Sequence, residues 1–312
     1  MDISVCICTW NRADLLDQTL RGLAAMSVPP DLEWELLVVN NNSSDHTDEV
    51  IARHEGVLPL RRLFEPKQGH SNARNCALAA ATGEIILWTD DDVLVDPSWL
   101  AEVAAAARRW PEASYFGGPI EPWYEEEPPA WVRDHLPMLI GPLVVLDYGP
   151  EVRPMTPGET AFGANLAFRA NVLKGHSFDP SLGRKGTSLI GYDEYDLMNR
   201  LRRSGHTGVW VGTARVRHYI PRRRMSERFV WEWFVADGQS QIRIGARQIG
   251  GRRVLGFPPH LVRRYARYRA KSLLRSGRKD DAWMTSFIEA ARTLGYLKEL
   301  RSARERVPAQ TA

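Results

Sequence analysis

Two groups of acidic residues in this sequence have the types and the spacing to do chemistry. Asp90, Asp91 and Asp92 directly follow an apolar run, and Asp193 and Glu194 form a second group. Neighbouring carboxylates raise each other's pKa unless a cation is present, and hard divalent ions take oxygen ligands of this kind and can bridge them to phosphate. A carboxylate of the second group could remove a proton from an attacking hydroxyl. The pattern predicts a divalent-metal site and a general base.

Both groups also have a simpler interpretation. Acidic residues are common near helix N-termini, where they interact favourably with the helix dipole. The helix after the first group already has Asp96 as its expected N-cap, followed by Pro97 in the first turn. Capping therefore does not explain the three aspartates. Asp193 and Glu194 could by themselves be the solvated start of the helix that we predict at 192–203.

The segments that carry these residues alternate between two periodicities. Short apolar runs predict strands at 3–8, 35–40, 61–64 and 84–89, and helical spacing predicts helices at 13–26, 45–53 and 71–81. Strands separated by helices indicate an α/β fold with a mostly parallel sheet. The three aspartates come at the end of the fourth strand, and open α/β sheets bind ligands at the carboxyl ends of their strands.

The second half of the chain is less regular. Residues 119–160 are rich in Pro, Trp and acidic residues and predict an elaborated loop region. From Ser226 to the end, the pattern is helical and basic, with breaks at Gly250-Gly251, Pro258-Pro259 and Ser276-Gly277.

Charge is unevenly distributed along the chain. Residues 1–200 contain 16 Lys and Arg against 30 Asp and Glu, whereas residues 201–312 contain 25 against 8. With 44% hydrophobic and 25% charged residues the composition is that of a globular protein, which argues against gross disorder. The acidic part suggests cation binding, and the basic part suggests contact with anions or a membrane surface.

One segment of the basic tail could either bind a membrane or pack within the protein. Leu261, Tyr265, Tyr268 and Leu273 can share a helical stripe beneath a dense Lys/Arg face. Basic amphipathic helices of this kind lie on anionic membranes. Alternatively, the stripe packs on the catalytic part of the chain.

The three cysteines, Cys6, Cys8 and Cys76, show neither a disulfide framework nor a Cys-x-x-Cys metal spacing. The N-terminus has no basic and apolar signal sequence, and the longest apolar run, 138–146, is too short to span a bilayer. We therefore expect a cytoplasmic protein, peripheral at the cytoplasmic face of a membrane if its tail binds lipid.

Four segments in order resemble the inverting family 2 glycosyltransferases of GT-A fold: residues 3–12, 38–47, 69–75 and 85–92. The segments Phe162–Phe168 and Phe178-Asp179 also match that family. The resemblance implies a Rossmann-like, mostly parallel sheet with flanking helices, followed by a helical basic C-terminal region. It implies a catalytic domain at 1–225, with a nucleotide-binding part at 1–118 and an acceptor-binding part at 119–225, and a helical extension at 226–312.

The resemblance also assigns residues to the donor, a UDP-, GDP- or dTDP-linked sugar. They are Thr9, Asn11, Arg12, Asn40, Asn41, Gly69, Arg74, Asp90 and Asp91. Members of the family usually carry Asp at the position of Asn40. Because an amide offers two donors and an acceptor where a carboxylate only accepts, we expect recognition of the nucleotide base to differ.

The same resemblance implies the metal ligands and the base. Asp92, Asp90 and His218 would bind Mn²⁺ or Mg²⁺, and an imidazole ligand favours Mn²⁺. Glu194 would be the catalytic base and Asp193 its neighbour. The family order Glu-Asp is reversed here, so the two roles could be exchanged.

For the acceptor, the resemblance implies a glycan, a lipid-linked sugar or a small molecule, and no nucleic acid. Processive members carry a Gln-x-x-Arg-Trp motif and membrane-spanning helices; the sequence shows neither, which predicts a single addition. Arg222-Arg223-Arg224 could grip a diphosphate through guanidinium forks or form a solvated loop.

Two other functions compete with sugar transfer. A nucleotidyltransferase would have a glycine-rich, basic phosphate loop after its first strand, and Thr9-Trp10-Asn11-Arg12 contains no glycine. A non-catalytic module that binds carbohydrate or sugar nucleotide would fit the 11 tryptophans, but it leaves both acidic groups unexplained.

Overall fold

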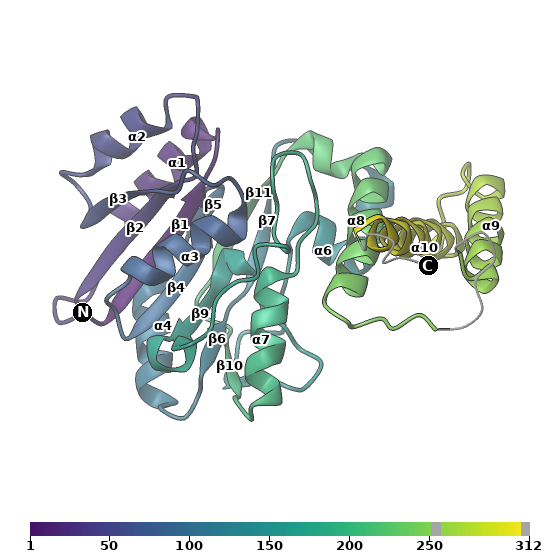
Figure 1. Cartoon of the computed structure of the whole chain (residues 1–312). Helices are drawn as coiled ribbons and strands as arrows, with labels where there is room; N and C mark the ends of the chain where they lie inside the picture. The colour runs from purple at the N-terminus through teal and green to yellow at the C-terminus, as the bar shows by residue number, and fades with distance from the viewer. Residues whose placement is uncertain (251–256, 307–312) are drawn as a thin grey trace. The chain divides into compact units, whose positions relative to one another are not determined.

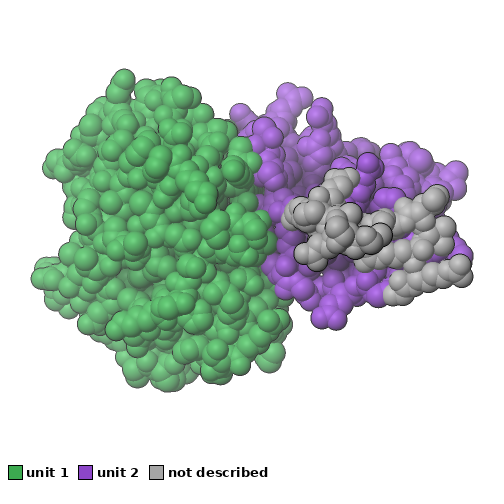
Figure 2. Space-filling model, in the orientation of Figure 1, with its two compact units in different colours: residues 1–123, 144–186, 193–220 green, residues 124–143, 187–192, 221–312 purple. Residues whose placement is uncertain are grey.

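The computed structural model describes residues 1–250 and 257–306. They divide into two compact units, shown in green and purple in Figure 2. Unit 1 comprises residues 1–123, 144–186 and 193–220, and unit 2 comprises residues 124–143, 187–192 and the part from 221 onwards. Two inner segments of the predicted 1–225 domain therefore group with the C-terminal region. In the described part of the chain, no helix combines the length and apolar character needed to cross a bilayer.

Unit 1 is built on an eight-stranded sheet in the order β3-β2-β1-β4-β9-β6-β10-β8. The strands are β1 (Ile3–Thr9), β2 (Trp34–Asn40), β3 (Leu60–Phe64), β4 (Ile85–Asp90), β6 (Tyr115–Gly117), β8 (Val152–Pro154), β9 (Leu166–Arg169) and β10 (Gly208–Val211). β1 pairs in parallel with β2 and β4, whereas β9 is antiparallel to β4 and β6. The predicted α/β fold with a mostly parallel sheet is confirmed.

Helices cover both faces of this sheet (Figure 1). They are α1 (Ala13–Ala24), α2 (Thr47–His54), α3 (His70–Ala80), α4 (Trp99–Arg109) and α7 (Asp193–Arg203). Alternate residues of β1 face opposite sides: Val5 joins the core formed with α1 and α4, and Cys6 joins the core formed with α3 and α7. A strand buried on both sides reads as a continuous apolar run, which is why the central strands could be predicted from the sequence.

A second sheet in unit 1 has three strands in the order β5-β11-β7. They are β5 (Val93–Val95), β11 (Val216–Ile220) and β7 (Ile120–Tyr124). The expectation of an irregular region at 119–160 is therefore partly wrong, since this stretch also holds β8 and the helices α5 (Ala130–Asp134) and α6 (Ile140–Leu143). Elements of three to five residues interrupted by proline are too short to show a periodicity.

Unit 2 contains three longer helices, as predicted for the basic C-terminal region. They are α8 (Glu227–Arg243), α9 (Pro259–Leu274) and α10 (Asp281–Arg306), and α10 packs against both others. Its core is aromatic, with Trp131 edge-on to Trp283 at 6.1 Å. The breaks near Pro258 and Ser276 are confirmed, and Gly251 lies outside the described residues. Among the described residues, short 3₁₀ helices lie at Leu136–Met138 and Arg222–Met225 in unit 2, and at Gly163–Asn165 and Ala170–Leu173 in unit 1.

The expected cap of α4 is wrong. The N-cap is Ser98, and Asp96 instead accepts hydrogen bonds from the amide and the hydroxyl of Ser98, at 2.9 and 2.8 Å. The Asp96 carbonyl accepts from the amide of Trp99 at 2.9 Å. Asp96 thus forms a turn before the helix, which an aspartate favours as strongly as a cap.

Candidate functional site

The three aspartates lie at the carboxyl edge of the parallel strands, as predicted. Asp90 ends β4 opposite Cys8 of β1, and Asp91 and Asp92 form the turn into β5. Asp91 and Asp92 are 4% and 3% exposed, while Asp90 is half-buried. Burial, and next the charge of Asp92, raise the pKa of Asp90 to about 7. So much buried negative charge is costly without a compensating cation.

Asp90, Asp92 and His218 can hold a metal ion together. One ligand atom from each lies within 4.8 Å of the others. His218 lies within β11 and not after it. It pairs with Val93 at the start of β5. This pairing places its buried ring beside Asp92, and His218 Nε2 lies 3.5 Å from Asp92 Oδ1. Two carboxylates and one imidazole form a donor set that suits Mn²⁺. The structure thus brings together the three predicted metal ligands.

Arg12 supplies a positive charge to this cluster. Its Nη1 donates to Asp91 Oδ1 and to Asp92 Oδ2, both at 2.8 Å. The charges of Asp91 and then Asp92 raise the pKa of Arg12 further, so the guanidinium stays ionised. Arg12 follows Asn11, whose φ of 52° belongs to the left-handed region that asparagine tolerates. This turn after β1 directs Arg12 at the aspartates.

The second acidic group begins α7 and is bound by Arg74 from α3. Arg74 Nη1 lies 2.9 Å from Asp193 Oδ2 and 3.1 Å from Glu194 Oε2. Arg74 is 2% exposed, and its guanidinium lies over the rings of Trp88 and Phe178, 5.8 and 5.3 Å from their centroids. The pair is therefore a buried ionic cluster and not the solvated helix start that was the alternative.

Asp193 and Glu194 have different environments within this cluster. Burial, and then the charge of Asp193, raise the pKa of Glu194. Burial acts in the same direction on Asp193, but the charge of Arg74 and several hydrogen bonds outweigh it and hold the pKa of Asp193 below its ordinary value. The side chain of Asp193 is 3% exposed and that of Glu194 is 21% exposed. Glu194 is thus the member of the pair that solvent and a substrate can reach.

Gly163 completes this cluster, and no sequence signal other than the matching segment around it pointed to this role. Its amide donates to Glu194 Oε1 at 3.2 Å. A Cβ at this position would lie 1.9 Å from Arg74 Nη2 and 3.3 Å from Glu194 Oε1. Only glycine allows the backbone to approach the Arg74 guanidinium this closely.

Two predicted donor residues use their side chains within the protein. The side-chain Nδ2 of Asn40 donates to Asp48 Oδ1 at 2.6 Å, and its Oδ1 accepts from the backbone amide of Ser43 at 2.8 Å. Asn41 donates to two backbone carbonyls of the loop that follows β3, and it accepts from the amide of Gly69 at 2.8 Å. Both asparagines are buried, and they brace the loops at the edge of the sheet.

Three further predicted donor residues lie at the same edge. Thr9 is buried at the end of β1, and Asn11 accepts from the amide of Ser44 at 2.7 Å. Gly69, with φ of 138°, directly precedes α3. The contacts of these residues with a donor remain predictions.

Arg184 belongs to none of the sequence motifs, but its loop contacts the site. Its carbonyl accepts from the amide of His70 at 2.8 Å, and the carbonyl of Leu182 accepts from the Ser71 hydroxyl at 2.7 Å. Between them, Gly183 adopts φ of 81°, where a Cβ would lie 2.5 Å from Ser71 Oγ. These contacts fasten the loop to the first turn of α3.

The Arg184 side chain belongs electrostatically to the site. Burial lowers its pKa, while the charges of Asp90, Asp92 and Glu194 act to raise it. Among the described residues, no carboxylate lies within ion-pair distance of this guanidinium. Its position in the sequence, shortly after the matching Phe178-Asp179, was the available signal.

The arginines at 222–224 belong to unit 2. Arg222 is 78% exposed and ion-pairs with Glu126 at 3.2 Å, and its amide donates to Glu125 at 2.7 Å. Arg224 is buried. A role for these arginines in gripping a diphosphate remains a prediction.

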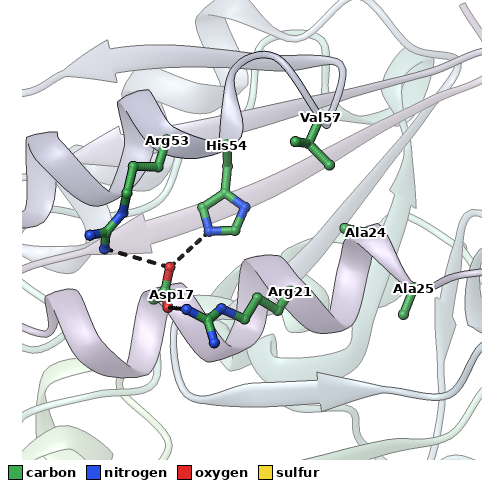
Figure 3. A pocket seen from close by; sticks show the side chains of 7 residues that line it. All are labelled: Asp17, Arg21, Ala24, Ala25, Arg53, His54 and Val57. Atoms are coloured by element: carbon green, nitrogen blue, oxygen red, sulfur yellow. Dashed lines mark hydrogen bonds and ion pairs between the residues drawn. The ribbon is translucent and has the colours of Figure 1, made fainter.

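A separate surface hollow of about 420 Å³ is lined by residues of α1 and α2 (Figure 3). At its centre, Asp17 contacts His54 at 2.9 Å and Arg21 at 2.7 Å, with Arg53 at 3.6 Å. The hydrogen bond from His54 is the main cause of the lowered pKa of Asp17. The Asp17 carboxylate is occupied by these three contacts, and the lining contains none of the predicted site residues.

The fold and the site together define an α/β protein of the GT-A type, with its acidic clusters in the unit that contains the sheet and the three aspartates at the carboxyl edge of the parallel strands. The model of the family described as glycosyl transferase family 2 matches residues 4–162, just over half of the chain. The chain belongs to this family.

Individual relatives agree with this assignment. The chain is 27% identical over 259 residues to the succinoglycan biosynthesis protein ExoM of Rhizobium meliloti, covering 81% of this chain and 78% of ExoM. Among solved structures it is similar to the mannosyltransferase PcManGT from Pyrobaculum calidifontis in complex with GDP-Man and Mn²⁺, with a TM-score of 0.62, 20% identity, and coverage of 96% and 87%. It is also similar to TarS 1–349 of S. aureus in complex with UDP, with a TM-score of 0.57, 16% identity, and coverage of 99% and 93%. The predicted family, fold and enzyme class are confirmed.

Proposed function

We propose that this glycosyltransferase moves one sugar from a nucleotide-diphosphate donor to an acceptor hydroxyl, with inversion and with the help of a divalent cation. The observation that carries the proposal is the pairing of two buried acidic groups in one unit. One has the donor set of a metal site, and the other has a partly exposed carboxylate with a raised pKa. A raised pKa brings a general base closer to the working pH.

The protein groups have separate tasks in this scheme. Glu194 accepts the proton of the acceptor hydroxyl as that oxygen attacks the anomeric carbon opposite the diphosphate, which inverts the configuration. Arg74 and the amide of Gly163 hold Glu194 in place. A cation bound by Asp90, Asp92 and His218 would stabilise the charge of the departing diphosphate.

The remaining residues would shape the donor pocket. Arg184 is a cation without a carboxylate partner among the described residues, which suits contact with a diphosphate oxygen. Asn40 and Asn41 support the loops by their internal hydrogen bonds. The solved relatives hold GDP-Man or UDP, and we propose a UDP-, GDP- or dTDP-linked sugar for this chain.

For the acceptor, we propose a glycan, a lipid-linked sugar or a small molecule, extended by a single sugar. A lipid-linked acceptor would place the enzyme at the cytoplasmic face of a membrane, with the basic helices of unit 2 in peripheral contact with it. Mass analysis of the product on each acceptor class would count the sugars added per chain.

The metal site can be tested by thermal shift, because a ligand stabilises a protein in proportion to its saturation. Nucleotides should raise the melting temperature of the wild-type protein more with Mn²⁺ than without it. Asp92→Asn and His218→Ala should lose this difference. Arg217→Ala is the matched control, because Arg217 neighbours His218 on β11 and points to solvent. An unchanged Mn²⁺ effect in both site variants would contradict the proposed metal ligands.

A further inference from the structure

Helix α9 has one apolar face that is already occupied. Leu261 and Ser272 are buried, and Tyr265 and Tyr268 between them are half-buried. Their spacing of four, three and four residues puts them on one side of the helix. Leu261 packs there with Tyr296 and Leu300 of α10. The two tyrosines that we expected at a membrane interface therefore lie on the internal side of unit 2.

Leu273 does not belong to that face, which corrects the predicted stripe. It comes five residues after Tyr268, which places it about 140° around the helix from that tyrosine, and it is 56% exposed. Val262 is 45% exposed on the same side. Ala266 and Ala270, at intervals of four residues from Val262, lie exposed between them.

These residues form an outer stripe, and Leu274, which is 86% exposed, lies beside its end at the last residue of α9. Eight large hydrophobic residues of the described chain are exposed, and Val262, Leu273 and Leu274 of this one helix are three of them. Exposed apolar residues that occur singly need no explanation, but residues collected on one face indicate a contact surface.

The outer stripe is bordered by positive charge. α9 contains five basic residues and no acidic residue. Two of them contact the neighbouring helices: Arg264 ion-pairs with Glu289 of α10, and Arg269 stacks over Trp231 of α8 at 4.7 Å. Arg267 lies over Tyr268, its neighbour in α9, at 5.7 Å. The other three, at intervals of four residues, form an exposed basic row beside the stripe: Arg263, Arg267 and Lys271.

We propose that this outer face of α9, the apolar stripe with its basic row, binds an anionic membrane surface. The inference deepens the membrane contact of the proposed function and rests on that part of it alone. The apolar stripe would enter the boundary between headgroups and acyl chains, while the basic row stays at the level of the lipid phosphates. Anionic lipid complements both the apolar stripe and the basic row. A nucleic acid would contact only the basic row and leave the stripe in water.

The test is co-sedimentation of the full-length protein with vesicles of phosphatidylcholine, alone or mixed with phosphatidylserine. We expect binding only to the anionic vesicles, weakening as salt increases. Replacing Arg263, Arg267 and Lys271 by Gln should weaken binding roughly a hundredfold, the fold-change that corresponds to about 1 kcal/mol per basic residue. Leu273→Gln with Leu274→Gln should weaken it at unchanged charge.

Val57→Gln is the matched control for the leucine variant, since Val57 is 68% exposed in unit 1. It should bind vesicles as the wild type does. The absence of binding at low salt would overturn the proposal, and so would binding that neither set of substitutions weakens. Duplex DNA that binds as tightly as the vesicles and is insensitive to the leucine substitutions would identify a general polyanion surface instead.

Donor turnover without vesicles, measured on the same preparations, separates the two proposals. Turnover in the α9 variants equal to that of the wild type shows that they are folded and that only vesicle binding has changed. Vesicle binding by a wild-type protein that shows no turnover with any donor would refute the proposed reaction and leave the membrane surface standing.

Discussion

Replacing Gly163 by alanine should disable the proposed base with a single methyl group. The new Cβ would lie 1.9 Å from Arg74 Nη2, so the guanidinium must move by about 1 Å or more to restore a normal contact. Arg74 has little freedom to do so, because it is 2% exposed between Trp88 and Phe178. The ion pairs of Arg74 at 2.9 and 3.1 Å would be distorted instead.

The magnitude follows from these contacts. Overpacking of a filled site costs about 1–3 kcal/mol of the free energy of unfolding. A displacement of about 1 Å at a catalytic group can lower turnover about 10²-fold. Glu194 would be displaced by this amount, because it is bound both to Arg74 and to the amide of Gly163. The nearest neighbours of the new Cβ belong to Arg74 and Glu194 and not to Asp90, Asp92 or His218, so the Mn²⁺-dependent part of donor binding should change little.

The assay compares Gly163→Ala with Gly158→Ala, whose Cβ would meet no atom within 4 Å. Urea unfolding gives the stability, steady-state transfer gives kcat and KM, and thermal shift with nucleotide and Mn²⁺ gives donor binding. We expect the control to match the wild type, and Gly163→Ala to lose kcat with little change in the KM for the donor. Equal stability and equal kcat in the two variants would refute the close packing of Gly163, Arg74 and Glu194.

Two further predictions concern carboxylates. Glu194→Gln should lower turnover by roughly 10²–10⁴ and Asp193→Asn by less; the reverse order would make Asp193 the base. Burial and the charge of Asp193 raise the pKa of Glu194, so acid should inactivate the wild type before the pH reaches the usual pKa of glutamate. The residual activity of Glu194→Gln should not show this loss. Glu159→Gln should destabilise the protein by about 1 kcal/mol near neutral pH, because hydrogen bonds from Arg153 hold the pKa of Glu159 at about 2. Urea unfolding measures this difference between the wild type and the variant. It should shrink as the pH falls below about 4, the pKa of glutamate in the unfolded chain, and vanish near the folded-state pKa of about 2. A difference that stays constant over this range would contradict the prediction.

The sequence predicted the parts of the site that depend on strand order along the chain. Asp90 to Asp92 follow a strand buried on both faces, and such strands show as unbroken apolar runs. His218 could be named only by resemblance. Its place next to Asp92 depends on the antiparallel pairing of β11 with β5, two strands more than 100 residues apart. No local pattern encodes that pairing.

Other features depended on side-chain geometry that local periodicity does not reveal. Gly163 is required at its position because a Cβ there would collide with the Arg74 guanidinium of α3. Arg184 is held near the site because the loop that carries it is hydrogen-bonded to the start of the same helix. The side-chain amides of Asn40 and Asn41 hydrogen-bond to neighbouring loops, which the sequence does not reveal, and their contact with the donor stays a prediction. Leu273 lies outside the buried face of α9, contrary to the prediction, because five residues turn a side chain about 140° around a helix.

Arg12 gives the aspartate cluster a counter-charge that belongs to the protein itself. Its two ion pairs at 2.8 Å reduce the electrostatic cost of leaving Asp91 and Asp92 without an ion. Folding of the protein would then not require metal, in contrast to small domains whose structure collapses when the ion is removed. Under the metal dependence that we propose, removal of the ion would leave an intact but inactive protein, and adding the ion back would restore activity without refolding.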